Sequence, residues 1–341
     1  MKRLEAPPGG FRRIAVIRLS SLGDVVLTLP TVRALKHAFP AAAIDYWTKE
    51  EFADLVRHDP AIAHVRELER DARRIEDLVS MSAELEERDL IVDLHSNWRS
   101  RVLSFQPRIP VLRAPRYRLR RSLLVHARWL GPQPVPPAVT RFGAALAPLG
   151  LAAEGTPELH VDAASEHWAE EWLRARGLSH PVALAPGARH ATKRWPEDSW
   201  CALIDRLAAA RIPIVALSLA SERDALPKLR ASLERAGGAW SCERLPRMAA
   251  LLSRCRACAS CDSGIMHVAA ARGVRVVVMF GSTAPELGFA PAGEGHAVLC
   301  RHEPCQPCTL HGRARCPRGH FRCMTELRDG EVWEALAARL R

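Results

Sequence analysis

The chain has 341 residues, of which 48% are hydrophobic and 26% charged, and its formal net charge is +11. This composition is typical of globular proteins and excludes an intrinsically disordered chain, and the length predicts two domains. No apolar run approaches the ~20 residues of a membrane-spanning helix, and residues 4–10 lack the apolar core of a signal peptide. We therefore expect a two-lobed protein that stays in the cytoplasm.

In the N-terminal part, short apolar and β-branched runs alternate with helical stretches, which is typical of a parallel α/β sheet. The first run is followed by a turn that ends at Gly23 and Asp24, and Asp24 opens a helix. Pro30 interrupts that helix, so we expect a kink or a restart there. The expected strands are Ile14–Arg18, Ile44–Trp47, His64–Arg66, Leu90–Leu94 and Ile109–Leu112.

Residues 94–153 contain ten arginines and no Asp or Glu. A solvated surface is one explanation, and a platform for an anionic partner is the one that we favour, because mixed surfaces rarely lack acids over such a length. Aromatic residues are sparse here and no nucleic-acid-binding signature accompanies them, so we expect no nucleic acid. The arginines are Arg99, Arg101, Arg108, Arg113, Arg116, Arg118, Arg120, Arg121, Arg128 and Arg141.

A Pro-rich region around residues 132–137 precedes a second α/β pattern, and the two patterns predict two Rossmann-like lobes, 1–155 and 156–341. A helix over Ser165–Arg176 is expected to be capped by Asp162 and stopped by Gly177. A final helix is expected over Gly330–Arg341. The expected strands are Val182–Ala185, Ile212–Leu217, Ala257–Ala259, Val274–Phe280 and Ala297–Cys300.

Two turns in the second half carry polar residues at the ends of predicted strands, where open α/β sheets bind their ligands. The first follows Pro186 and Gly187 and leads to Lys193, which by itself is more often a solvated charge. The second is Asp262-Ser263-Gly264, which opens an Ala-rich helix carrying His267. Backbone N–H groups at such a helix start bind phosphate, although an ordinary Asp-Ser N-cap is the alternative.

Ten cysteines in a cytoplasmic chain are not expected to form disulfides. Cys255, Cys258 and Cys261 straddle a short strand, so we interpret them as small core residues. The Cys-rich loop over residues 300–323 is different, because its spacing and two nearby histidines suit a structural zinc ion. Free thiols or a redox-sensitive pair remain the alternatives. The candidate zinc ligands are Cys305, Cys308, Cys316 and Cys323.

Taken in order, these motifs resemble those of glycosyltransferase family 9, the heptosyltransferases of lipopolysaccharide core synthesis. The resemblance covers nearly the whole chain, and the cysteine-rich tail is also similar to that of many members. The motifs are Arg18–Pro30, Pro186-Gly187-Ala188 with Lys193-Arg194-Trp195-Pro196, Asp262–His267 with Phe280-Gly281, and Cys305-Gln306-Pro307-Cys308 with Cys316-Pro317 and Cys323-Met324.

The resemblance implies a GT-B fold, with the active site in the cleft between the lobes and the terminal helix crossing back to the first lobe. It implies an inverting transferase that moves heptose from an ADP-heptose donor to a lipid A/Kdo inner-core acceptor, at the inner face of the inner membrane. Asp24 would be the catalytic base and Lys193 would stabilise the departing diphosphate. A family member using another nucleotide sugar, or a non-catalytic binder of anionic surfaces or nucleic acid, are the alternatives.

The remaining ligand roles follow the same resemblance. The second lobe would bind the donor, and Glu222 would accept hydrogen bonds from the ribose, unless it is only an acid in the first turn of a helix. No Asp-x-Asp motif follows a strand, so we expect catalysis without a metal cofactor. The expected donor ligands are Lys193, Glu222, Asp262, Ser263, Gly264 and His267, and the expected acceptor ligands are Arg99, Arg116, Arg118, Arg120 and Arg121.

Overall fold

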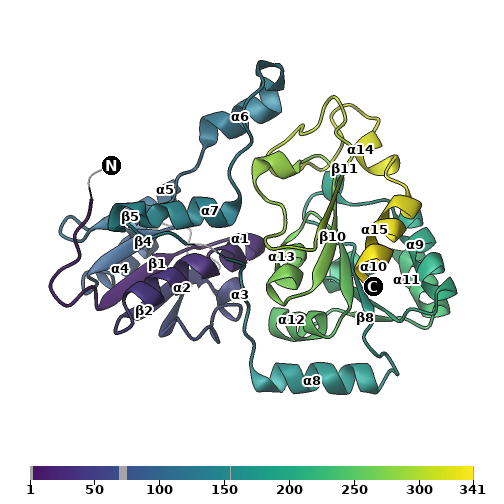
Figure 1. The fold of residues 1–341 in the computed structure, drawn as a ribbon, viewed down its shortest axis with the longest axis horizontal. Helices are drawn as coiled ribbons and strands as arrows, with labels where there is room; N and C mark the ends of the chain where they lie inside the picture. The colour runs from purple at the N-terminus through teal and green to yellow at the C-terminus, as the bar shows by residue number, and fades with distance from the viewer. Residues whose placement is uncertain (1–2, 69–74, 154, 341) are drawn as a thin grey trace. The chain divides into compact units, whose positions relative to one another are not determined.

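The computed structural model of the chain describes residues 3–68, 75–153 and 155–340. The chain divides into two compact units, each built around one parallel sheet with helices on both faces (Figure 1). The first unit comprises residues 1–116 and 137–161, and the second comprises residues 117–136 and 162–341. The predicted α/β class with two Rossmann-like lobes is confirmed.

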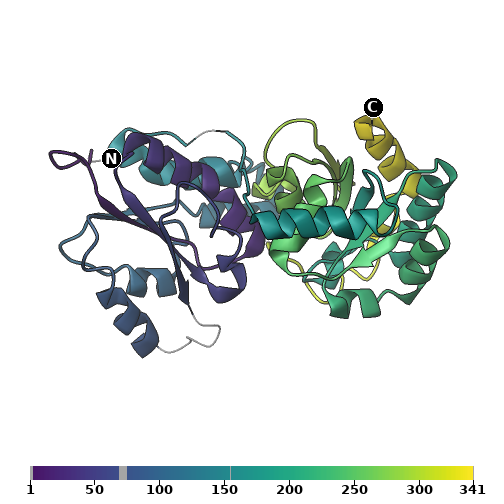
Figure 2. The ribbon, with the colours of Figure 1, turned by 90° about the horizontal axis from the view of Figure 1, so that it is seen from below.

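The sheet of the first unit contains the five predicted strands, all parallel, in the order β3-β2-β1-β4-β5. Helices α1 (Leu22–Leu27), α2 (Leu29–Ala38) and α7 (Ala138–Gly143) lie on one face, and α4 (Ile75–Ala83) and α5 (Trp98–Leu103) on the other (Figures 1 and 2). The short helices α3 (Glu50–Ala53) and η2 (Ala144–Leu149) complete the unit. The strands are β1 (Arg13–Ile17), β2 (Ala43–Lys49), β3 (His64–Leu68), β4 (Leu90–Asp93) and β5 (Val111–Arg113).

The predicted interruption at Pro30 takes the form of a helix restart. Helix α1 ends at Leu27 and α2 begins at Leu29, with Thr28 between them. Pro30 therefore stands in the first turn of α2, where its missing N–H removes no helical hydrogen bond. The restart leaves α1 as a short helix directly after β1, with Asp24 in its first turn.

The sheet of the second unit has six parallel strands in the order β11-β10-β9-β6-β7-β8. Five were predicted, whereas β8 has only three residues and no apolar pattern that would have revealed it. The strands are β6 (Val182–Ala185), β7 (Ile214–Leu217), β8 (Ala239–Ser241), β9 (Ala257–Cys261), β10 (Arg275–Phe280) and β11 (Ala297–Cys300).

Helices α9 (Glu197–Ala209), α11 (Pro227–Arg235) and α15 (Asp329–Leu340) cover one face of this sheet, and α12 (Leu245–Ser253) and α13 (Gly264–Ala271) cover the other. Helix α8 (Ala163–Arg174) packs against α12 (Figure 2). Its predicted cap is confirmed, because Asp162 Oδ1 accepts from the backbone N–H of Ser165 at 2.7 Å. Two short helices, α10 (Ala220–Asp224) and α14 (Arg322–Thr325), complete the set.

The three cysteines around β9 are core residues, as predicted. Cys258 and Cys261 are fully buried in the strand, and Cys255 just before it is also buried. Burial raises the pKa of the Cys258 and Cys261 thiols to about 12. These thiols are therefore neutral packing groups at physiological pH.

The segment 117–136 falls in the second unit, whereas the predicted boundary near residue 155 places it in the first lobe. The reason is apolar contact: Leu124 of α6 (Arg118–His126) forms a buried cluster with Val135 and Leu287. The Val135 N–H also donates to the Glu286 carbonyl at 2.8 Å. The terminal helix α15, which was expected to cross back to the first lobe, packs instead against α9, β9 and β10 of the second unit.

Each sheet has one place where the strand order reverses direction. It lies between β1 and β4 in the first unit and between β6 and β9 in the second. Loops at the carboxyl ends of such adjacent strands separate and leave room for a ligand. Among the helices that the structure describes, none is long and apolar enough to cross a membrane.

Candidate active site

In the first unit, Asp24 lies where β1 gives way to α1, at the point where the strand order reverses. Its Oδ2 accepts from Ser21 Oγ at 2.9 Å and from the Ser21 backbone N–H at 3.3 Å. The Arg18 guanidinium lies 2.7 Å from the same oxygen, and the two side chains are 11% and 17% exposed. Asp24 is thus part of the helix cap and is also a charge-paired carboxylate near the surface.

Arg18 and His95 connect this carboxylate to the neighbouring strand. Arg18 Nη1 donates to the Leu94 carbonyl, just after β4, at 2.7 Å, and its guanidinium lies over the Phe142 ring. The His95 ring is hydrogen-bonded to the backbone of Ser20. Burial, helped by the positive charge of Arg18, lowers the pKa of His95 to about 3, so its imidazole is neutral at physiological pH.

His95 was not among the residues predicted from the sequence. Its position directly after the predicted strand Leu90–Leu94 was a usable signal, because open α/β sheets bind their ligands at the ends of strands. Arg18, Ser21, Asp24 and His95 together form what we call the Asp24 cluster. It can accept a proton through the carboxylate, with a guanidinium that neutralises the carboxylate charge.

In the second unit, the structure brings Lys193 and Asp262 together. Lys193 is the last residue of η3 (Ala191–Lys193), and its Nζ lies 2.7 Å from Asp262 Oδ2, with both side chains largely buried. Thr283 Oγ1, from the loop after β10, donates to the same oxygen at 2.6 Å. Thr283 was not predicted, because nothing in the sequence marks a single threonine in a loop as a second partner.

The start of α13 carries backbone donors without a side-chain cap. The helix begins at Gly264 with Ser263 as N-cap residue, and no side chain caps it. Ser263 Oγ is buried and has no hydrogen-bond partner among the described residues. The ordinary N-cap expected as the alternative is therefore not formed, and the N–H groups of this turn suit an anion. His267 is buried one turn further along α13.

Glu222 lies against the turn that follows β6. Its Oε2 accepts from the Leu219 backbone N–H at 3.1 Å, so it caps α10 as the alternative reading held. A Cβ atom on Gly187 would stand 2.3 Å from Oε2, so the close approach of the turn to this carboxylate requires glycine at that position. We call Lys193, Asp262 and Thr283, with Ser263, Gly264 and His267 at the start of α13, the Lys193 cluster. The contacts of Glu222 described above are with Leu219 and the turn at Gly187.

The five predicted acceptor-binding arginines are divided between the units. Arg99 and Arg116 belong to the first unit, where Arg116 Nη1 donates to the Ser96 carbonyl at 3.1 Å. The other three belong to α6 in the second unit. Arg120 lies over the Tyr117 ring and Arg121 over the Phe289 ring.

The four cysteines of the tail lie around one small pocket. Cys305 Sγ lies 3.6 Å from His320 Nε2, and burial raises the pKa of the Cys323 thiol to about 12. Within the described ranges, however, no three His, Cys, Asp or Glu side chains are arranged to hold a metal ion. The predicted zinc ligands share a location without forming a coordination site in this structure. The pocket is lined by Cys305, Cys308, Cys316, Cys323, His320, Phe321, Gln306, Thr192, Gly281 and Ser282.

Comparison with known proteins gives consistent matches. The family profile described as Glycosyltransferase family 9 (heptosyltransferase) matches residues 79–315, which is more than half of the chain and includes the Lys193 cluster but not Asp24. Lipopolysaccharide heptosyltransferase 1 of Pseudomonas aeruginosa is 29% identical, over 87% of this chain and 86% of the relative.

Solved structures share the fold. The glycosyl transferase family 9 protein from Veillonella parvula superposes with a TM-score of 0.81 at 20% identity, covering 99% of both chains. The E. coli ADP-heptose lps heptosyltransferase II superposes with a TM-score of 0.74 at 21% identity, covering 96% of this chain and 98% of that one.

Proposed function

Because this chain belongs to glycosyltransferase family 9, the heptosyltransferases, we propose that it transfers heptose from ADP-heptose to the inner core of lipopolysaccharide, with inversion at the anomeric carbon. The chain is a glycosyltransferase with the GT-B fold. The identity of the sugar and of the acceptor is our proposal, and the names of the relatives support it. The observation that carries it is the uncapped start of α13 beside the Lys193 ammonium, a combination suited to a nucleotide diphosphate.

The transfer assigns one role to each cluster. Asp24 accepts the proton of the acceptor hydroxyl, whose oxygen forms a bond to the anomeric carbon. The bond between that carbon and the diphosphate oxygen breaks, and ADP leaves with the electron pair. Attack opposite to the leaving group inverts the configuration.

The charge that grows on departing ADP is stabilised in the second unit. Lys193 is paired with Asp262 at 2.7 Å in this structure, so a bound diphosphate competes with Asp262 for the ammonium group. The N–H groups of Ser263 and Gly264 supply further positive potential at the start of α13. We propose that these groups stabilise the leaving group without a metal cofactor, so that chelators leave the transfer rate unchanged.

The acceptor is a phosphorylated lipid A/Kdo core, which suits the ten arginines of residues 94–153. An acceptor that carries acyl chains is presented at a membrane surface. We therefore propose that the protein works in the cytoplasm, in peripheral contact with the inner face of the inner membrane.

The direct test is to incubate the protein with ADP-heptose and defined truncated core acceptors, and to detect products by mass. A mass increase of one heptose on one acceptor is the expected result. Transfer only from another nucleotide sugar would replace heptose in the proposal. No transfer from any donor, together with RNA capture on filters at physiological salt, would favour a non-catalytic nucleic-acid binder.

A further inference from the structure

Exposed apolar side chains gather in the stretch of the chain that has no acidic residue. Eight large hydrophobic residues are exposed in the part of the chain that the structure describes, and five of them fall between residues 98 and 130. That stretch also contains nine of the ten arginines. A surface that combines basic and apolar side chains without acids has the composition of an interfacial membrane contact. The five are Trp98, Phe105, Leu119, Trp129 and Leu130.

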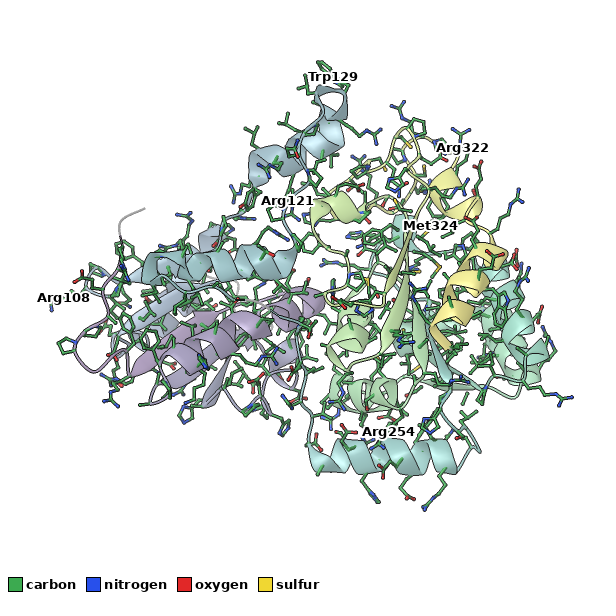
Figure 3. The ribbon with its side chains drawn as sticks, viewed as in Figure 1. Arg108, Arg121, Trp129, Arg254, Arg322 and Met324 are labelled. Carbon is green, nitrogen blue, oxygen red and sulfur yellow. The ribbon has the colours of Figure 1, made fainter. Side chains whose placement is uncertain are left out.

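Three of these five residues lie on α6 and the 3-10 turn η1 (Arg128–Leu130). Trp129 is 83% exposed, Leu119 75% and Leu130 56%. Trp129 stands at the outer end of the segment, whereas Arg121 lies nearer the rest of the second unit (Figure 3). An exposed tryptophan beside an exposed leucine costs hydration free energy, unless a partner covers both.

The inner side of the same segment is fixed to the second unit. Leu124 packs with Val135 and Leu287, and the Arg121 guanidinium lies over the Phe289 ring at 4.9 Å from its centroid. Because the inner side of the segment is packed, the segment has a fixed position in the second unit. The exposed side chains on its outer side are therefore part of the folded structure.

Basic side chains surround the apolar ones. Arg118 is exposed at the start of α6, and Arg120 and Arg128 are partly exposed along the segment. Residues 117–136 themselves contain no acidic residue. Such a cluster is attracted to an anionic surface, and the attraction extends over about a Debye length, ~8 Å at physiological salt.

We propose that the tip of this segment, formed by Arg128, Trp129 and Leu130, docks the protein on an anionic phospholipid surface, and that Arg118 and Leu119 at the start of α6 add to the contact. Trp129 and Leu130 enter the interface between head groups and acyl chains, where amphipathic indole rings are favoured, while the arginines contact lipid phosphates. RNA would engage the arginines and one ring but would leave two leucines exposed, so lipid fits better. The inference rests on the proposed function, which includes a peripheral contact with the membrane. It adds the identity of the residues that contact the lipid.

Cosedimentation with phosphatidylcholine vesicles, with and without phosphatidylglycerol, tests the docking. The wild-type chain should bind the anionic vesicles and lose binding as salt rises. Replacing Trp129→Ser and Leu130→Ser together should weaken binding by about tenfold or more, and Arg128→Ala by about fivefold. Val79→Ser, which removes an exposed apolar side chain from α4, is the matched control and should bind like wild type.

Two further measurements separate the outcomes. Transfer to a soluble, truncated acceptor should be the same in the double variant and in wild type, which establishes that the variant is folded. Brominated lipid should quench tryptophan fluorescence in wild type and much less in Trp129→Ser. Unchanged vesicle binding by the double variant would overturn the docking role, as would RNA binding that requires Trp129 while vesicles are ignored. Vesicle binding without any heptose transfer would leave the tip assigned and refute the proposed reaction alone.

Discussion

Arg18 places its guanidinium 2.7 Å from Asp24 Oδ2 and donates through Nη1 to the Leu94 carbonyl at the same distance. One side chain therefore joins the carboxylate to the end of the neighbouring strand, across the reversal in strand order. The backbone N–H and the hydroxyl of Ser21 both donate to the same carboxylate oxygen. The orientation of Asp24 is determined by these contacts before any acceptor binds, which is the preorganisation that a general base requires.

Replacing Asp24→Asn should lower kcat by ~10²–10⁴, the usual size of general-base loss, with ADP affinity nearly unchanged. The amide oxygen can still cap α1, so the helix should keep its structure. Steady-state kinetics with a saturating donor would measure the effect. Turnover at the wild-type rate would remove Asp24 from the mechanism.

Lys193→Ala should weaken ADP binding and slow transfer together, because the ammonium contacts charge that grows on the diphosphate. A charge-assisted hydrogen bond of ~1.5–3 kcal/mol corresponds to a loss of ~10–150-fold. Lys228→Ala is the matched control, since Lys228 is an exposed lysine of the same unit paired with Asp198. Calorimetry with equal ADP affinity for wild type and Lys193→Ala would contradict the assignment.

Gly187→Ala should disturb the donor site without replacing a charged residue. The added Cβ would stand 2.3 Å from Glu222 Oε2, so the carboxylate must move away from the turn. If Glu222 binds the ribose, ADP affinity should fall about tenfold, the loss expected for one strong hydrogen bond. Gly330→Ala, whose Cβ has no neighbour closer than 3.6 Å, is the control. Unchanged ADP affinity in Gly187→Ala and in Glu222→Gln would assign Glu222 to helix capping alone.

His95 should make the protein less stable in mild acid. Burial and Arg18 lower its pKa to about 3 from the ordinary 6.5, while Asp24 acts in the opposite direction and Arg116 in the same one. Between these two values the unfolded chain binds a proton that the folded chain excludes. The free energy of unfolding should therefore fall with decreasing pH across this window, by up to ~1.4 kcal/mol per pH unit. Urea unfolding of wild type and His95→Gln at pH 7 and pH 5 would measure it, and equal pH dependence would contradict the prediction.

Reversing charge at Arg99 and Arg116 should raise the KM for a soluble phosphorylated acceptor and flatten its salt dependence, because screening weakens exposed charges. The KM for the ADP-sugar should barely change. The same reversal at Arg118, Arg120 and Arg121 tests whether the arginines of the second unit share this role. An equal rise in KM for both substrates would indicate misfolding. An unchanged KM for both would mean that these arginines are only solvated surface residues.

The amino-acid sequence by itself determined the α/β class, ten of the eleven strands that the structure describes, and the turns that carry Asp24, Lys193 and Asp262. It could do so because buried parallel strands are continuous apolar runs and because ligand-binding turns follow them at fixed places. The restart at Pro30 and the core packing of Cys258 are likewise local consequences of residue type.

Only the tertiary structure decided which side chains meet. His95, Thr283 and Arg18 reach their partners across strands distant in sequence, and no local spacing encodes such contacts. The three-residue strand β8 forms by parallel pairing with the edge of β7, and no apolar sequence pattern of its own predicts it. The segment 117–136 belongs to the second unit because Leu124 and Val135 pack against Leu287 there. Burial of apolar surface is favourable wherever a complementary apolar surface exists, and the sequence of the segment does not show where that surface lies.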